Sequence, residues 1–174
     1  MKHLITSLVL ALGLVTIAHA EDGKVVVEDL TFATPAPWKA AENASAMRKA
    51  TLTIEAKGAE KPMEAVFYYF GSCQGGDVDA NIQRWVGQFQ STTDTKREDV
   101  EIEGVKVTLV KATGTYMDGA MFGEKTAKEN WALLGAIVPG KEAPVFIKLT
   151  GPKDAALSIY DTFKAMATSP FVKK

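Results

Sequence analysis

Residues 67–89 read FYYFGSCQGGDVDANIQRWVGQF, and this stretch sets the fold that the rest of the chain completes. Its apolar start belongs to a run from Ala65 to Phe70 that is hydrophobic at every position, which is typical of a central strand covered on both faces. A glycine-rich turn follows at residues 71–76, and a helix-period pattern begins directly after it. The stretch therefore predicts a strand, a tight turn and a helix in immediate succession.

The predicted helix has one apolar face and a clear start. Asp77 precedes it, and aspartate caps helix N-termini well. Four apolar side chains fall within roughly 60° of arc on a helical wheel, with a fifth at the edge: Val78, Ile82, Trp85, Phe89 and, at the edge, Val86. We expect this face to pack against a sheet.

Beside the apolar face runs a polar row. Its members recur at i, i+4, i+7 and i+11, with one more amide in the turn before them: Asp77, Asn81, Arg84, Gln88 and, in the turn, Gln74. One interpretation is a recognition surface whose charged and amide groups face a ligand or a partner. The other is a solvated flank, which is the ordinary case on surface helices. These five residues are the first group of candidate binding residues.

The rest of the chain reads as sheet and one further helix. Strands are predicted where apolar and polar residues alternate or where apolar runs end in turn residues: 25–32, 50–54, 65–70, 102–109, 131–138 and 145–149. Residues 39–45 and 92–99 are predicted connections. Gly151-Pro152 opens the second helix, with proline where a first turn tolerates it. Its predicted buried stripe is Ala156, Ile159, Tyr160, Phe163 and Met166.

Residues 114–130, GTYMDGAMFGEKTAKEN, form the longest segment without a clear period and are predicted to be a loop. Its apolar residues are the least explained by any periodicity: Tyr116, Met117, Met121 and Phe122. If they are exposed, they make an adaptable contact surface. If the segment folds back, they close the open end of the core. Both interpretations stand, and these four residues are the second candidate group.

Residues 1–20 have the pattern of a secretory signal peptide. Lys2 supplies the positive end, residues 4–17 form an apolar run, and Ala18-His19-Ala20 provides small residues where a signal peptidase cuts. The run is short for a membrane span, and acidic residues follow it directly. We therefore expect an exported, soluble protein, periplasmic or extracellular, whose single α+β domain covers residues 21–174.

Composition excludes several chemistries. Both histidines, His3 and His19, lie in the predicted signal, which rules out Ser-His-Asp and Cys-His nucleophile systems and histidine-ligated metals. Cys73 is the sole cysteine, so the chain has no intrachain disulfide and no thiolate cage. Without residues 1–20, 19 basic residues stand against 21 acidic ones, a net charge of −2 that gives no reason to expect nucleic acid. We expect no catalytic residues, no cofactor and no metal.

Carboxylates offer a remaining route to catalysis. Four lie close together in the sequence: Glu98, Asp99, Glu101 and Glu103. A glycosidase needs only two carboxylates, although acids in a charged hairpin are ordinarily solvated. A carboxylate-based hydrolase acting on envelope or extracellular carbohydrate is therefore an alternative function. A small-molecule carrier, which requires an apolar cavity, is another.

The order of elements resembles the PsbP/Mog-type fold. That resemblance implies an α+β architecture, an α/β/α sandwich with a mainly antiparallel central sheet of about six strands and two main helices. More closely, the chain resembles a family of uncharacterised exported bacterial proteins in four segments: YYFGSCQGGDVDANIQRWVGQF (68–89), GTY (114–116), ALLGAIV (132–138) and FIKLTGP (146–152). The pattern from Gln74 to Trp85 is the most specific of these, and Cys73 departs from it because the family has a small residue there.

The resemblance implies a fold and export but brings no activity. The wider fold mostly serves the binding and assembly of larger complexes, as the resemblance implies. The leading hypothesis is a non-enzymatic, exported binding or accessory domain. Its partner would be another protein or an envelope component, with no nucleic acid and no membrane span after signal removal. The expected contact surfaces are the 71–77 turn with the polar row and the 114–130 segment, and the oligomeric state is left open.

Overall fold

The computed structural model describes residues 20–21, 23–43, 45, 47–72, 75–119 and 123–173. Of the predicted signal segment, only Ala20 is described. Three predicted binding residues, Gln74, Met121 and Phe122, also lie outside the described residues, as does Cys73.

A seven-stranded antiparallel sheet carries the fold, in the order β4-β5-β6-β10-β9-β8-β7, and a three-stranded sheet β1-β2-β3 lies beside it. The strands of the large sheet are β4 (Lys39–Ala41), β5 (Arg48–Ile54), β6 (Met63–Tyr68), β7 (Phe89–Ile102), β8 (Val105–Gly119), β9 (Lys125–Val138) and β10 (Val145–Pro152). Those of the small sheet are β1 (Ala20–Glu21), β2 (Lys24–Val27) and β3 (Leu30–Ala33). The α+β class and the antiparallel sheet are confirmed, with seven strands in place of about six.

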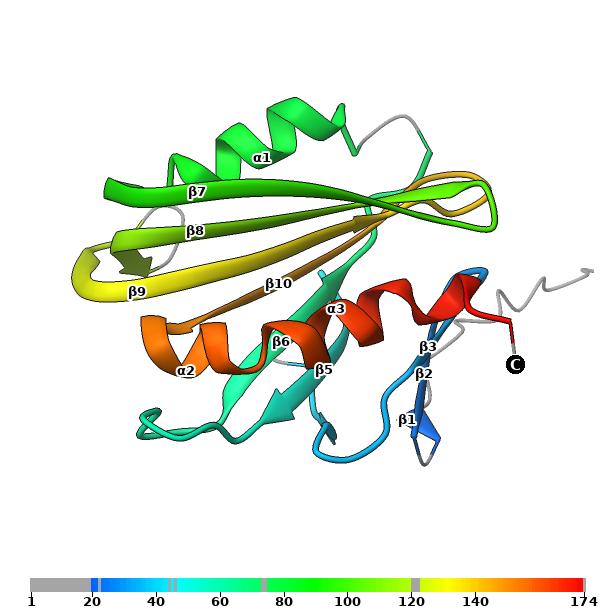
Figure 1. Cartoon of the computed structure of the whole chain (residues 1–174), viewed down its shortest axis with the longest axis horizontal. Coiled ribbons are helices and arrows are strands. Elements are labelled where there is room, and N and C mark those ends of the chain that lie inside the picture. Colours follow the sequence, from blue (N-terminus) through cyan, green and yellow to red (C-terminus); the bar gives the residue numbers. More distant parts are fainter. Residues whose placement is uncertain are drawn as a thin grey trace, which may run out of the picture.

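Helices cover both faces of the large sheet. They are α1 (Val78–Val86), α2 (Lys153–Ser158), α3 (Tyr160–Thr168) and the short 3₁₀ helix η1 (Ser169–Phe171). Figure 1 shows α1 on one face, and α2 and α3 end to end on the other, so the α/β/α layering is confirmed. The predicted second helix is interrupted at Ile159, whose φ of −104° and ψ of 10° separate α2 from α3. Among the described residues, no helix is long and apolar enough to cross a membrane.

The larger core lies between the sheet and α2, α3 and the small sheet. The predicted stripe of the second helix faces it, with Tyr160 partly buried and the other members fully so: Ala156, Ile159, Phe163 and Met166. Opposite them, alternate residues of β5 and β10 are at most 7% exposed: Ala50, Leu52, Ile54, Val145, Ile147 and Leu149. Strand alternation directs these side chains to one face, as the sequence pattern predicts.

The smaller core lies under α1. Trp85 is 5% exposed, and its ring lies over Gly135 of β9, where an added Cβ would be 2.4 Å from the indole. The same ring meets Phe146 of β10 edge to face, with centroids 6.4 Å apart. Val78 and Ile82 are partly buried against this core. The apolar face of the helix is therefore placed as predicted, and glycine in the facing strand lets the indole approach the sheet closely.

Two segments predicted as connections are strands instead. Residues 92–99 lie within β7, and residues 114–130 lie largely within β8 and β9. Tyr116 pairs with Lys128 and Gly119 pairs with Lys125, so this part of the chain is an antiparallel ladder. The prediction was wrong because residues 92–99 and the described residues from Asp118 to Asn130 are mostly exposed and polar. They take strand conformation from backbone pairing with a neighbour rather than from an apolar pattern.

Near the N-terminus, a predicted strand is a hairpin and a predicted loop contains a strand. Residues 25–32 divide into β2 and β3, with Glu28 in the left-handed conformation at φ 54° where the chain turns. Residues 39–45 include β4, which pairs with β5 at the sheet edge. The two-residue hairpin turn carries no glycine or asparagine, so the sequence lacks the usual turn signal.

Candidate functional site

The N-terminus of α1 is capped and tied to the sheet. Asp77 has extended backbone angles, and its Oδ1 accepts a hydrogen bond from the Ala80 amide at 2.8 Å, so the expected cap is confirmed. Asp79 in the first turn lies 2.6 Å from Nη1 of Arg97 in β7. The two acids of the helix start therefore serve the helix and its attachment to the sheet.

Asn81 does not belong to an exposed surface. It is 2% exposed, and its Nδ2 donates to the carbonyl oxygens of Gly75 at 2.6 Å and Asp77 at 2.8 Å. Arg84 donates to its Oδ1. The amide thus holds the turn against the helix, and neither interpretation of the polar row fits this residue. A helical wheel gives the angular position of each residue but does not show which neighbouring segments cover it. Here the turn before α1 lies over the polar side of the helix at Asn81.

Gln88 meets Tyr116 and Lys148 beyond the end of α1. The helix ends at Val86, so Gln88 lies in the turn that leads into β7 rather than on the helix. The Tyr116 hydroxyl donates to its Oε1 at 3.0 Å. The Lys148 ammonium donates to the same Oε1 at 2.5 Å and to the Tyr116 hydroxyl at 2.9 Å. We call these three residues the Lys148 cluster.

The β8–β9 hairpin places Tyr116 in this cluster. Gly114, at φ +152°, lets the neighbouring β7 backbone come close, because a Cβ there would lie 2.0 Å from the Ser91 carbonyl oxygen. The register between β8 and β9 shifts between Gly114 and Tyr116, which brings Lys128 opposite the tyrosine. The Tyr116 ring stacks on Trp131 with centroids 5.9 Å apart, and Lys128 Nζ lies 5.9 Å from the Trp131 ring centroid.

Burial changes the acidity of both ionisable members of the cluster. Desolvation is the largest cause for each, and it raises the pKa of Tyr116 to about 12 and lowers the pKa of Lys148 to about 8. At neutral pH the cluster is therefore a protonated ammonium with a neutral phenol and a neutral amide. It can donate hydrogen bonds to an anion, and it has no general base of its own.

The structure brings together one member of each candidate group and adds a residue the sequence reasoning missed. Gln88 comes from the polar row, and Tyr116 comes from the 114–130 segment. Met117 follows Tyr116 in the strand and so points to the opposite face, where it is partly buried. Lys148 is the missed residue. Its signal was present, since it is the only charge in an otherwise apolar strand.

Glu98 and Asp99 of β7 do not form a pair. Glu98 and Asp99 are consecutive in the strand and so point to opposite faces of the sheet. Glu98 accepts from Tyr160 and Lys164 of α3. Asp99 accepts from Thr108 and from Arg97, whose hydrogen bond holds the pKa of that carboxyl below its usual range. Within the described residues, no group of three or more His, Cys, Asp or Glu side chains is placed to hold a metal ion.

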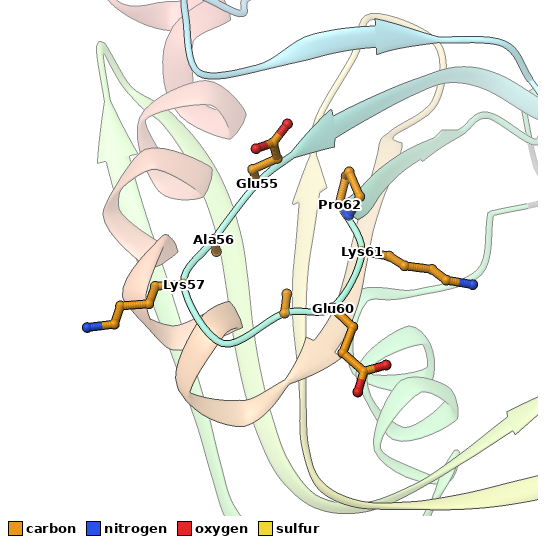
Figure 2. Close-up of a pocket in the computed structure, with 7 residues that line it drawn as sticks. Glu55, Ala56, Lys57, Glu60, Lys61 and Pro62 are labelled. Atoms are coloured by element: carbon orange, nitrogen blue, oxygen red, sulfur yellow. The ribbon is translucent and has the colours of Figure 1, made fainter.

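A hollow of about 450 Å³ lies at the connection between β5 and β6, lined by residues 55–57 and 59–62. Figure 2 shows the side chains of Lys57, Glu60 and Lys61 directed outward from the loop. Ala56 and Ala59 are instead packed against the larger core. No set of functional groups converges on this hollow, and its charged rim does not suit an apolar ligand.

No protein-family model matches the sequence, and no curated protein matches it. Among solved structures, the chain is similar to the solution structure of cyanobacterial PsbP (CyanoP) from Synechocystis sp. PCC 6803. The TM-score is 0.51 at 13% sequence identity, and the match covers 91% of this chain and 95% of that chain. At this identity the likeness concerns the fold alone, and the chain has a PsbP-like fold.

Proposed function

We propose that the chain is an exported, non-catalytic binding or accessory domain formed by residues 21–174. Its contact face comprises the C-terminal end of α1 and the adjoining β8–β9 hairpin. The observation that carries the proposal is the meeting of Gln88 and Tyr116 at Lys148. Two surface segments that are far apart in the sequence converge there on a charged group, as a recognition site requires.

The rest of this face suits binding rather than chemistry. Arg84 is exposed, and Lys128 is partly exposed beside the Trp131 ring. Basic and aromatic side chains of this kind are typical of interface anchors. The hydrolase alternative finds less support, because Glu98 and Asp99 are committed to cations on opposite faces. The carrier alternative would need an apolar cavity, which the hollow between β5 and β6 does not supply.

A capture experiment with matched variants tests the proposal. The chain starting at Glu21 serves as bait for periplasmic or secreted extract of the native host. We expect a partner that is retained by the wild-type chain and reduced at least fivefold by the double change Arg84→Ala and Lys128→Ala. The matched control is Lys57→Ala with Lys61→Ala, which removes two cations from the distant β5–β6 loop.

The two pairs of variants separate a local contact from general charge. Equal loss with both pairs would mean that net charge drives capture, and full retention with the Arg84 and Lys128 pair would place the contact elsewhere. Both results would contradict the proposed face. Circular dichroism and thermal melts establish that each variant is folded before capture is compared.

A further inference from the structure

Lys148 is a mostly buried cation whose hydrogen-bond partners are neutral. It lies in the middle of β10, paired with Val66 of β6 and Gly135 of β9. Strand alternation puts it on the same face as Phe146, which packs against Trp85 of α1. Its Nζ donates to an amide oxygen of Gln88 and to the phenol oxygen of Tyr116. Among the described residues, no carboxylate lies within ion-pair distance of it. A buried charge without a counter-charge is costly, so the position favours an anion.

The charged groups around Lys148 add to this demand. Arg48 of β5 repels the ammonium, and Asp118 near the end of β8 is the one acid that favours its charged form. Asp118 is exposed, and its attraction is outweighed by the loss of solvation. Arg48 is itself engaged with Glu64 of β6, at 2.8 Å from Nη1 to Oε2. Of the two charges that act on Lys148, one is therefore a second cation whose acid is already engaged, and the other is a single exposed acid.

The ammonium also has hydrogen-bonding capacity left. It carries three N–H donors, and two are used by Gln88 and Tyr116. Arg48 directs Nη1 to Glu64, and its guanidinium has four further N–H donors. A carboxylate supplies two acceptor oxygens and one negative charge, which matches what Lys148 lacks.

We propose that Lys148, held by Gln88 and Tyr116, is a recognition site for a carboxylate group brought by the binding partner or by a small organic acid. The inference rests on the proposed function only in placing the site on the contact face. Lys148 supplies the charge, and Gln88 and Tyr116 fix the position of the ammonium. The two sources present the same chemistry, and the experiment distinguishes them.

Nuclear magnetic resonance of the Lys148 side chain tests the proposal without any partner. In the chain labelled with ¹³C-lysine, the Cε shift of Lys148 is followed against pH, alone and with acetate or with a hexaglutamate peptide as probe. Binding to the protonated form raises the pKa of Lys148, so we expect an upward shift of about one unit at about tenfold excess of probe over its dissociation constant. A shift with acetate identifies a free acid as sufficient, and a shift with the peptide alone identifies an acidic segment.

Three variants make the result specific. Lys148→Met removes the observed side chain, so probe binding is compared between variants through the backbone amide shifts of Gln88 and Tyr116 in ¹⁵N-labelled chain, and in Lys148→Met these should not respond to either probe. Gln88→Glu installs a carboxylate where the amide oxygen now stands, so the pKa of Lys148 should rise without probe and the response to probe should disappear. Lys111→Met is the matched control, because Lys111 lies on β8, which β9 separates from β10, and its ammonium lies over the Tyr160 ring on the other face of the sheet.

The proposal is overturned if neither probe moves the pKa of Lys148 in the wild-type chain. It is also overturned if Lys111→Met reduces probe binding as much as Lys148→Met does. If a probe shifts the pKa of Lys148 but the Arg84→Ala and Lys128→Ala double variant still captures the partner fully, the carboxylate site stands and the proposed face is rejected. The two proposals can therefore fail separately.

Discussion

Two clusters of lysine and tyrosine lie on opposite faces of the same sheet, and one carboxylate distinguishes them. On the face of α3, the Tyr160 hydroxyl donates to Glu98 at 2.7 Å, and Lys164 donates to the same carboxylate. On the face of α1, Tyr116 and Lys148 make the corresponding hydrogen bonds to the amide oxygen of Gln88. The two clusters have similar hydrogen bonds, but the acceptor is a charged carboxylate in one and a neutral amide oxygen in the other.

The difference separates an internally satisfied cluster from one that lacks a counter-charge. The hydrogen bond from Lys164, followed by that from Tyr160, lowers the pKa of Glu98, so the carboxylate stays ionised and joins α3 to β7. Lys111 adds a cation 3.8 Å from the Tyr160 ring centroid. No such charge meets Lys148 within the described part of the chain. Lys164 thus has its counter-charge within the fold, and Lys148 does not.

The largest expected effect comes from uncovering the Lys148 face. Trp85→Ala removes the indole that lies over Gly135 and should lower the free energy of unfolding by about 3–5 kcal/mol. With α1 loosened, water should reach Lys148 and return its pKa from about 8 toward its ordinary value. Urea denaturation and the Lys148 Cε titration measure the two effects.

The matched control for this prediction is Phe163→Ala on α3. Phe163 is fully buried against the opposite face, so its loss should cost a similar free energy and leave the pKa of Lys148 in place. If both variants moved that pKa equally, the two faces would respond as one unit and the comparison would lose its basis.

The sequence predicts the burial pattern of this arrangement but not its long-range contacts. The apolar periodicity predicts which residues of α1, α3, β5 and β10 are buried, because burial and strand or helix period are both local properties. It misses the strand character of residues 92–99 and 114–130, whose pairing partners lie across a hairpin. It also cannot tell that Gln88 and Lys148 meet, since they are far apart in the sequence and only sheet order and the α1–β7 turn bring them together.

Asn81 and Lys148 show the same limit at the level of single residues. Each is a polar residue at a position whose burial depends on a neighbouring segment, the 71–77 turn for Asn81 and Tyr116 with the end of α1 for Lys148. A lone lysine in an apolar strand is nevertheless a usable signal, because burying a charge is costly and calls for a reason. By this criterion the sequence alone makes Lys148 a candidate.

The second-largest effect is expected from removing the charge of Lys148, which has no counter-charge nearby in the described part of the chain. Lys148→Met keeps the length of the side chain without the ammonium and should raise the free energy of unfolding at pH 7 by about 1–3 kcal/mol. The wild-type chain should itself gain about 1–2 kcal/mol between pH 7.5 and 9.5, because the folded protein releases the Lys148 proton above its pKa of about 8 while the unfolded chain keeps it. This gain should be absent in the variant.

Urea denaturation of both proteins at several pH values checks this prediction. The range stops at pH 9.5, below the tyrosine pKa of about 10 in the unfolded chain, so that tyrosine ionisation contributes little. The quantity compared is the difference between wild type and variant at each pH, which cancels the other groups that titrate. A constant difference across the range would show that Lys148 carries no penalty in the folded state.

The smallest expected effect comes from removing the carboxylate of Glu98, the counter-charge of Lys164 on the other face. Glu98→Gln makes the α3 cluster resemble the Lys148 cluster, but Glu98 and Lys164 keep 42% and 34% of their side-chain surface exposed, so solvent screens the lost charge. We expect a loss of about 0.5–1 kcal/mol at pH 7 and low salt, shrinking at high salt. Because the pKa of Glu98 is lowered in the folded protein, its stabilisation is present above the unfolded value and disappears as the pH falls through the folded one. Urea denaturation at pH 7 and pH 3 should therefore show a smaller difference between the two proteins at the lower pH. A loss at pH 7 as large as the gain from Lys148→Met would mean that exposure does not set the cost of an unpaired lysine in this sheet.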